Sequence, residues 1–290
     1  LGLTQAALLH ASDIYGRACR HAVFAACDAV GLEVVDFEFE HAGQTRRRSM
    51  ANAVAQLAET RIEVVLCTSI GAQDTAVIVA AALEHGLMAV GSSWAFTDGL
   101  TAADADAVVA ELGDEAREAL HGSLQIRAVG ATDDNPRWVS FADEWWPSAQ
   151  ERDFNPVLPR EWQLPDGFFS TFNPRTSGEL MHAGTFEYDA IVAAGIYACQ
   201  ITPRGPLPSD FGTRFWDHKQ NTTIEGLTGE VAFDADGNRD IATANVQLLN
   251  MIPGADGFFE VNVVAHINGD SWAWVGGDRV ASGSVFNRNE

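Results

Sequence analysis

The residues best suited to bind a ligand directly follow the predicted strands in the first half of the chain. In an open parallel sheet, ligands bind beyond the carboxyl ends of the strands, so this edge selects the candidates. They are hydroxyl, carboxylate, aromatic and small residues: Ser12, Asp13, Ile14 and Tyr15 after the first strand, Thr68, Ser69, Ile70 and Gly71 after the third, and Gly91, Ser92, Ser93 and Trp94 after the fourth.

These candidates combine several hydroxyls, the carboxylate of Asp13, and the aromatic rings of Tyr15 and Trp94. Backbone amides at the start of the helix that follows Gly71 would add an anion-binding edge. This mixture suits a small polar or zwitterionic ligand held in a concave site. We therefore interpret the set as one wall of a ligand-binding cleft.

A purely structural role is the alternative for each of these residues alone. Ser12 or Asp13 could cap the helix that follows. Ser92 and Ser93 could form only turn hydrogen bonds. The binding interpretation therefore depends on the set and not on any single member.

Sequence signatures of catalysis are missing. Residues 90–94 (VGSSW) lack the second glycine of a GxSxG nucleophile elbow. Residues 12–17 (SDIYGR) do not form the GxGxxG loop of dinucleotide sites. The chain has no phosphate loop ending in GKS or GKT and no HExxH motif. We predict no enzymatic activity and no catalytic residue; an enzyme with a flavodoxin-like sheet is the alternative, and it explains only the alternation of strands and helices.

Alternating strand and helix patterns would position the candidate residues. The predicted strands are Leu3–His10, Glu33–Glu40, Ile62–Cys67, Leu87–Val90 and Ser123–Val129. The predicted helices run from Gly16 to Val30, Ser49 to Thr60, Gln73 to His85, and Ala102 to Leu120 with an interruption near Gly113. Short links between such elements predict an α/β fold with a doubly wound parallel sheet.

The second half of the chain has a different texture. After about Gly130, prolines and tryptophans become frequent, which predicts short helices and loops packed by large aromatic side chains. Helical spacing returns over Gly184–Cys199. The following region alternates with the period of strands, and hairpin turns are predicted in it. The turns are Asp236-Gly237, between strands Glu230–Phe233 and Asp240–Leu249, and Asn268-Gly269, between Phe258–Ile267 and Ser271–Val275.

The charge of the chain excludes nucleic acid as a partner. The 290 residues include 40 acidic and only 18 basic ones, a formal charge of −22, and such a surface repels phosphate backbones. No apolar run approaches the roughly 18 residues of a membrane span, so any membrane attachment would lie in segments outside this chain.

No metal and no cofactor are predicted. The four cysteines lack the spacing of a zinc site and are interpreted as buried thiols. Cys19 and Cys27 would lie roughly 12 Å apart on one helix, which is too far for a disulfide. Asp234, Asp236 and Asp240 lack the terminal glutamate of a calcium loop, and a hairpin turn explains them better. Asn221-Thr222-Thr223 is a glycosylation sequon and gives weak support for secretion.

Four sequence blocks resemble one known family in order and spacing. Residues 12–18 (SDIYGRA) look like the start of the second lobe of receptor-type bilobed ligand-binding domains, and residues 64–94 resemble the next strand–helix–strand of that family. Residues 188–190 (YDA) resemble its YDA helix. The most specific match is residues 224–239 (IEGLTGEVAFDADGNR), which follow its GLTG hairpin. The family is the type I periplasmic-binding-protein-like superfamily, which includes natriuretic-peptide receptor ectodomains and the Venus flytrap domains of class C G-protein-coupled receptors.

The resemblance implies a type I periplasmic-binding-protein-like fold with two lobes. Residues 1–130 would form lobe two, and residues 131–290 would form later elements of lobe one with a β-rich crossover at the end. The first half of lobe one, which normally grips the backbone of an amino-acid ligand, would be absent from this sequence. We would then expect a fragment, a degenerate homologue or an incompletely traced protein.

The resemblance also implies the site and its ligand. Tyr15 matches the aromatic residue that stacks on ligand in glutamate-type members, and Ser69 and Gly71 fall in the loop that lines the cleft. Ser93 falls where those members often have an aspartate for the ligand ammonium, so recognition of ordinary α-amino acids is in question. Binding would close a hinge between the lobes without chemistry on the ligand.

The expected function is a non-enzymatic extracellular or cell-surface module that binds a small polar ligand, amino-acid-like or a small anion. A homodimer through lobe one is a further expectation. One alternative is a bacterial solute-binding protein in the periplasm. Another is a degenerate family member that acts as a protein–protein interaction or assembly module.

Overall fold

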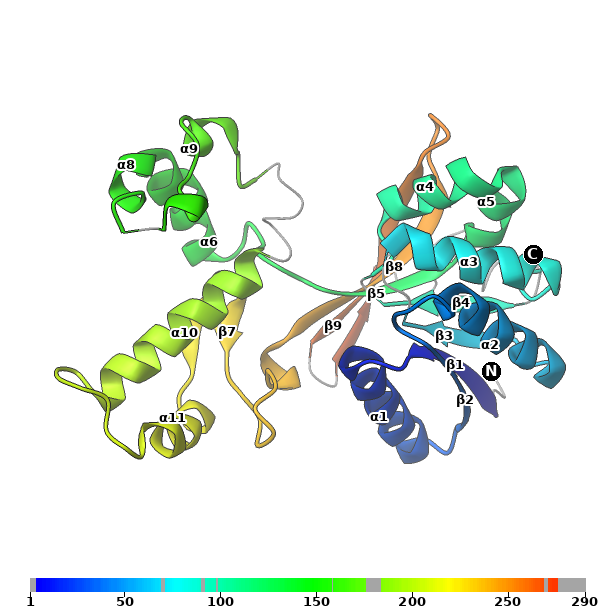
Figure 1. The fold of residues 1–290 in the computed structure, drawn as a ribbon, viewed down its shortest axis with the longest axis horizontal. Helices are drawn as coiled ribbons and strands as arrows, with labels where there is room; N and C mark the ends of the chain where they lie inside the picture. Colours follow the sequence, from blue (N-terminus) through cyan, green and yellow to red (C-terminus); the bar gives the residue numbers. More distant parts are fainter. Residues whose placement is uncertain are drawn as a thin grey trace. The chain divides into compact units, whose positions relative to one another are not determined.

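The computed structural model describes residues 4–68, 71–89, 92–97, 99–157, 159–175, 184–268 and 271–275. Within it the chain divides into two compact units. The first unit contains residues 1–127, 247–266 and 272–290, and the second contains residues 128–246 and 267–271. Figure 1 labels their elements.

A large mixed sheet is the centre of the first unit. Its strands are β1 (Gln5–Ala11), β2 (Glu33–Phe39), β3 (Val64–Cys67), β4 (Ser93–Phe96), β5 (Leu124–Ala128), β8 (Asn245–Pro253), β9 (Phe259–Asn268) and β10 (Ser271–Trp274). They are ordered β10-β9-β8-β5-β4-β3-β1-β2. The five neighbouring strands β5, β4, β3, β1 and β2 are parallel. The predicted α/β class with a doubly wound parallel sheet is therefore confirmed.

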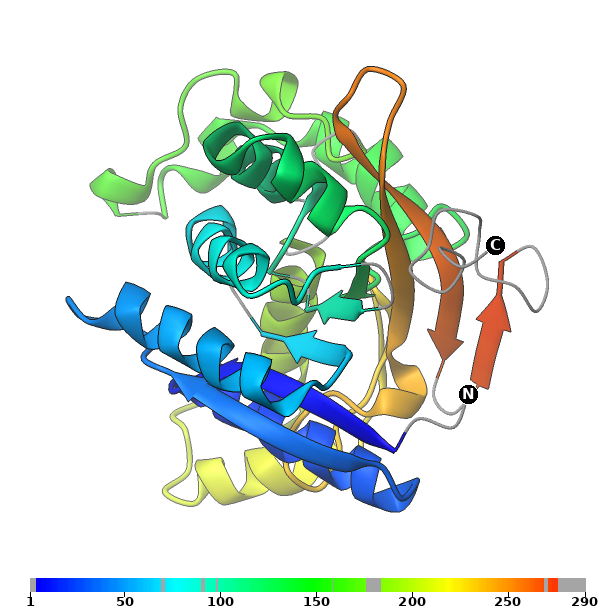
Figure 2. The ribbon, with the colours of Figure 1, turned by 90° about the vertical axis from the view of Figure 1, so that its right-hand side faces the viewer.

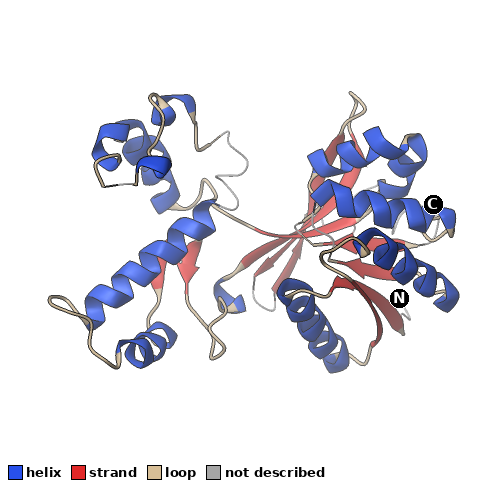
Figure 3. Ribbon diagram, viewed as in Figure 1, coloured by secondary structure: helices blue, strands red, loops and turns tan. Residues whose placement is uncertain are grey.

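Helices cover both faces of the parallel strands (Figure 3). They are α1 (Ile14–Ala29), α2 (Arg46–Thr60), α3 (Gly71–Glu84), α4 (Ala102–Leu112) and α5 (Asp114–Leu120). Figure 1 shows α1 on one face and the other four on the opposite face. The break between α4 and α5 falls at Gly113, where φ is 85° and an L side chain would be strained, as the sequence predicted.

The main core lies between the sheet and helices α2 to α5. Alternate strand residues point into it, among them Leu9, Phe39 and Phe96, all at most 2% exposed. The other face carries a polar cluster. His10 is fully buried there, with Nε2 3.2 Å from Oδ2 of Asp36, and Arg20 of α1 donates to the same carboxylate oxygen at 2.6 Å. This cluster ties α1 to the sheet.

The fourth predicted strand is wrong. Residues 87–89 form a turn, because Gly86 (φ 68°) ends the helical segment before them, and the strand begins only at Ser93. The apolar run Leu87–Val90 resembles a strand in composition, but its last residue lies outside the described residues. The alternation that marks the real strand is that of Trp94 and Phe96, at 2% and 1% exposure.

The β-rich region pairs differently from the prediction at one place. The long strand β8 does not pair with the segment before Asp236-Gly237. It joins the large sheet next to β5, where the Gly122 amide donates to Met251 and the Met251 amide donates to Ser123, which is antiparallel. β8 and β9 form the long orange hairpin of Figure 2. β9 and β10 are neighbours as expected, but Gly269 of their turn lies outside the described residues.

The second unit consists of short helices, two longer helices and a small hairpin. Its elements are α6 (Pro136–Ser140), a π-helical turn (Phe141–Trp145), α7 (Trp146–Ser148), α8 (Glu151–Phe154), a 3-10 turn (Arg160–Trp162), α9 (Phe168–Thr171), α10 (Thr185–Ile201), α11 (Phe211–Gln220), β6 (Ile224–Gly226), β7 (Gly229–Val231) and a 3-10 turn (Ile241–Thr243). Aromatic stacking connects the short helices, with ring centroids of Phe141 and Trp145 5.1 Å apart. The predicted region of loops and large aromatic side chains is confirmed.

All four cysteines are free thiols, but they are not all buried. Cys67 is buried in β3, whereas Cys199 is exposed near the end of α10. The expectation of a buried thiol is confirmed for Cys67 alone, since Cys19 and Cys27 are half-buried and α10 presents Cys199 to solvent.

Candidate functional site

Asp13 is the centre of the candidate site at the carboxyl edge of the parallel strands. It caps α1: its Oδ1 accepts the amide hydrogen of Gly16 at 2.7 Å. Its Oδ2 lies 3.1 Å from Nδ1 of His41, which follows β2. The backbone amide of His41 in turn donates to Oγ of Ser12 at 3.1 Å. Asp13 therefore caps the helix and also presents a carboxylate oxygen to the neighbouring strand end.

His41 was missing from the sequence candidates. β2 and β1 are parallel neighbours, paired up to Ala11 and Phe39, so their carboxyl ends meet at the same edge. The rule that selected residues after the first, third and fourth strands would have selected His41 too, had it been applied to the second. The pair places a titratable ring, half exposed, beside a carboxylate that is 21% exposed.

Tyr15 lies two residues after Asp13, in the first turn of α1, and is 37% exposed. It is thus on the same strand end as Asp13, with part of its side chain accessible. Gly16 is necessary to this arrangement: a Cβ at Gly16 would lie 2.1 Å from the carbonyl oxygen of Ala11. Only glycine lets α1 begin so close to the end of β1.

The hydroxyls at the ends of β3 and β4 are buried, and that of Thr68 donates to the carbonyl of Leu9 at 3.4 Å. Thr68 is buried and its amide donates to Leu9 at 2.9 Å, while the amide of Thr97 donates to Cys67. The hydroxyl of Thr97 is buried and has no hydrogen-bond partner among the described residues. Ser69, a candidate from the sequence, lies outside the described residues.

Gly71 begins α3 with φ 76°, but its amide does not form an open anion site. The Gly71 amide donates to the carbonyl of Gly99 at 2.7 Å, and the next amide, of Ala72, donates to Oδ1 of Asp104 at 3.2 Å. The expected anion-binding edge at this helix start is wrong for these two amides, because α4 and the turn before it already satisfy them.

Ser93 and Trp94 are not at this edge. Ser93 is the first residue of β4 and pairs with Val64, the first residue of β3, so it lies at the amino edge of the sheet. Trp94 is 2% exposed in the core and its Nε1 donates to the carbonyl of Leu87 at 3.3 Å. Their assignment to the loop after a strand is wrong, because the strand comes later in the chain than predicted.

The family motifs of the second unit form one buried polar cluster. Asp189, in the YDA segment of α10, is 2% exposed. Its Oδ1 accepts the amide of Leu227 at 2.6 Å, and its Oδ2 accepts the amide and hydroxyl of Thr228 at 2.9 and 2.6 Å. A Cβ at Gly226 would lie 2.4 Å from this carboxylate. The GLTG turn is therefore built around Asp189.

Two more residues hold the same turn. Asn135, the N-cap of α6, donates its side-chain amide to the carbonyls of Gly226 and Leu227 at 3.1 and 2.8 Å. Arg239 donates to the Thr228 carbonyl at 3.2 Å and to its hydroxyl. Burial lowers the pKa of Arg239, and the charge of Asp189 opposes that shift. The carboxylate of Asp189 and the hydroxyl of Thr228 are engaged within this cluster, whereas Nε of Arg239 is buried with no hydrogen-bond partner among the described residues. The motif therefore holds a turn.

The GLTG segment forms the antiparallel hairpin of β6 and β7 that the sequence predicted. Beyond it, the Asp236-Gly237 turn is present, with the Gly237 amide donating to Asp234 at 3.0 Å, but it is followed by a single bridge between Phe233 and Arg239. Asn221 of the sequon is exposed at the end of α11, and its side-chain amide donates to the carbonyl of Asp217 at 2.7 Å.

Among the described residues, no cluster of three histidine, cysteine or acidic side chains could hold a metal ion. None of the helices described is both long and apolar enough to cross a membrane.

The comparisons with known proteins agree with these motifs. The model of the receptor family ligand-binding region matches residues 1–253. No curated protein matches the chain as a relative. Because the match covers most of the chain, the chain belongs to the family of receptor ligand-binding regions.

Proposed function

We propose that the first unit binds a small amino-acid-like ligand at the carboxyl edge of strands β1 to β4. Family membership indicates a ligand-binding module of the receptor kind. The observation that carries the proposal is the strand end with Asp13 and His41, whose side chains are 3.1 Å apart and both partly exposed, beside the accessible Tyr15. Asp13 would accept the ligand ammonium, and Tyr15 would contact its apolar part.

The module works, in this proposal, without chemistry on the ligand and outside the cell, as is typical of the family. Ligand binding would close the two units by a hinge motion, and that closure would be the signal. Asn221, exposed at the end of α11, would carry a glycan. Small-angle scattering with and without ligand would test closure, since the radius of gyration is expected to fall when ligand is added.

A thermal-shift screen against the L-amino acids and small anions tests the site itself. A ligand present at 100 times its dissociation constant stabilises the folded state by about 2.7 kcal/mol. For a domain of this size that corresponds to about 5–10 °C in melting temperature. We expect such a shift with at least one amino acid and none with chloride or sulfate.

Two variants locate the bound ligand. Asp13→Asn keeps a good N-cap for α1 but removes the negative charge, so the melting temperature without ligand should hold while the ligand shift is lost. Tyr15→Ala should also remove the shift. Tyr188→Ala is its matched control, because Tyr188 lies on α10 of the second unit and its exposed fraction, 40%, is similar to the 37% of Tyr15. An undiminished shift in both site variants would refute the assignment.

A further inference from the structure

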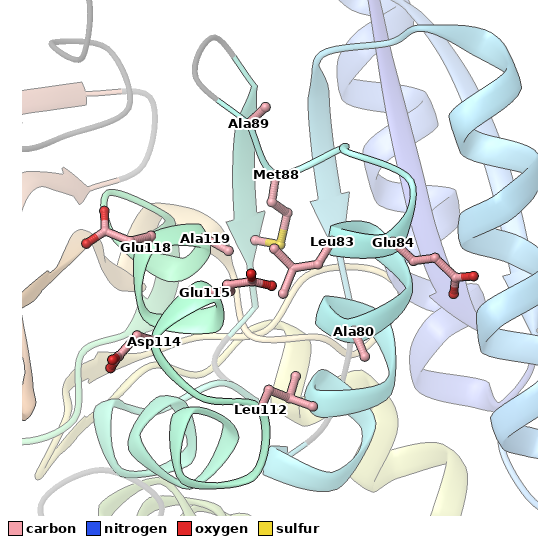
Figure 4. A pocket seen from close by; sticks show the side chains of 10 residues that line it. All are labelled: Ala80, Leu83, Glu84, Met88, Ala89, Leu112, Asp114, Glu115, Glu118 and Ala119. Carbon is pink, nitrogen blue, oxygen red and sulfur yellow. The ribbon is translucent and has the colours of Figure 1, made fainter.

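A second concave surface of the first unit lies away from the strand-end site. It is a cavity of about 850 Å³ between the second half of α3, the turn after it, and the helices α4 and α5 (Figure 4). Leu83, Leu112 and Ala119 line it and also pack on the main core, and Met88, 7% exposed, is part of that core. Its floor is therefore rigid and apolar.

Carboxylates surround this apolar floor. Figure 4 shows Glu84 on the α3 side of the cavity and Asp114, Glu115 and Glu118 on the α5 side. Every charged residue of the lining is acidic. The net charge of −22 alone does not explain this, since four other cavities of the described residues each have an arginine in their lining.

The rim charges are only partly compensated. Arg117 of α5 lies 3.7 Å from Asp114 and donates to the carbonyl of Gly257. Within the described part of the chain, neither Glu84 nor Glu115 forms an ion pair. Two carboxylates close to an apolar floor are thus left to solvent, where a cationic partner would find them.

The floor continues along α3 into a second hollow of about 340 Å³, which shares Ala80, Glu84 and Leu112 with the first. The arginine of that hollow, Arg47, lies 4.0 Å from Glu111 and is paired with it. Between Ala76 and Leu83, α3 presents apolar side chains to these hollows. Seven residue steps of helix are about 10 Å long. Apolar anchors at positions i, i+4 and i+7 of a bound helix span the same length.

We propose that this surface, the α3–α5 groove, docks a basic amphipathic helix of a partner protein. The apolar stripe of such a helix would lie on Ala80, Leu83 and Met88, and its flanking lysines or arginines would meet carboxylates on both rims. A second copy of this chain is a poor occupant, because two surfaces with this excess of negative charge repel each other.

A synthetic peptide tests the proposal. The probe is a labelled peptide of about 15 residues of leucine and lysine, with leucines at helical spacing. Its binding to the full chain is measured by fluorescence anisotropy at about 0.15 M salt. The first control peptide has the same leucines and lysines in strict alternation. The second keeps the helical spacing of the leucines and has glutamate in place of lysine. We expect the helical basic peptide to bind at least about tenfold more tightly than either control.

Three protein variants place the binding. Glu84→Gln, Glu115→Gln and Glu118→Gln together remove three groove charges and should weaken binding at least about fivefold. Asp28→Asn, Glu161→Gln and Glu187→Gln remove three exposed charges that do not line the groove and should leave the affinity within about twofold.

The third variant, Ala80→Arg, puts a long cation on the floor and should abolish binding while the melting temperature is kept. Equal losses in the two charge triples would overturn the proposal, because the attraction would then come from net charge. Equal binding of the alternating peptide would overturn it too. So would a wild-type dimer in size-exclusion chromatography that Ala80→Arg converts to monomer, since the groove would then belong to a second copy.

Discussion

Replacing Asp189 should destabilise the second unit more than any surface substitution. The carboxylate accepts three hydrogen bonds in a site that is 2% exposed. Asp189→Ala removes all three acceptor contacts and leaves the amides of Leu227 and Thr228 buried without a partner. It also leaves the half-buried guanidinium of Arg239 without the charge that stabilises it.

The magnitude follows from these contacts. A hydrogen bond to a charged group contributes about 1.5–3 kcal/mol, and the losses do not add fully because the groups share one site. Breaking one side of a buried charged contact typically costs about 3–5 kcal/mol, and we expect a loss in that range for Asp189→Ala. That is at least about a fifth of the roughly 5–15 kcal/mol that stabilise a typical domain. Asp189→Asn should cost about half as much, because it keeps one acceptor oxygen but turns an NH₂ group toward a donor.

Urea denaturation measures this loss. With a denaturant slope of about 2 kcal/mol per molar, the unfolding midpoint of the second unit should fall by about 2 M. Amide hydrogen exchange locates it, since the amides of Leu227 and Thr228 should be slow in the wild type and fast in the variant. Asp236→Ala, on the exposed turn of the same region, is the control and should change neither. A loss below about 1 kcal/mol with both amides still protected would refute the reasoning.

Two further predictions concern the first unit, and a substitution in α10 of the second unit is the control for one of them. Gly16→Ala should destabilise by about 3 kcal/mol or prevent folding, because the new Cβ would lie 2.1 Å from the carbonyl oxygen of Ala11. Gly195→Ala in α10 meets nothing within 4 Å and should stabilise by about 0.5–1 kcal/mol; thermal melts of both variants check the pair. The hydrogen bond from Arg20 is the largest cause that lowers the pKa of Asp36, so its stabilisation is present at neutral pH and is lost as pH falls below about 4. Arg20→Gln should therefore lower stability at pH 7 and have little effect at pH 2, and a constant difference across that range would contradict the assignment.

Local periodicity was sufficient to predict most elements of the first unit. Residues that alternate toward the core along a strand, and small or apolar residues that repeat along one face of a helix, are set by the geometry of those elements. The interruption at Gly113 was predictable because glycine is a poor helix former, and in the structure it adopts a positive φ there. The fourth strand was missed because an apolar turn after a helix has the composition of a strand. Only the alternation of Trp94 and Phe96 distinguishes them.

Pairing between distant segments was not predictable in this way. β8 pairs with β5, more than a hundred residues earlier in the chain, and not with the nearer segment before Asp236. Local sequence specifies that a segment is a strand, but the partner depends on which sheet edge the whole fold leaves open. The candidate site was limited by the same errors. Asp13 and Tyr15 follow a correctly predicted strand and lie at the expected edge, whereas Ser93 and Trp94 follow a wrongly placed one and lie elsewhere.

The residues that make the family recognisable are not those that would choose its ligand. Asp189, Gly226, Thr228 and Arg239 are buried against one another, so any change in one of them leaves a polar group unsatisfied or creates a clash. Such a cluster is needed for folding, whatever the domain binds. Asp13 and Tyr15 are partly exposed at a strand end, where their side chains can reach a ligand. The same physical chemistry that makes the family certain from the GLTG turn therefore leaves the ligand to be found by experiment at the strand ends.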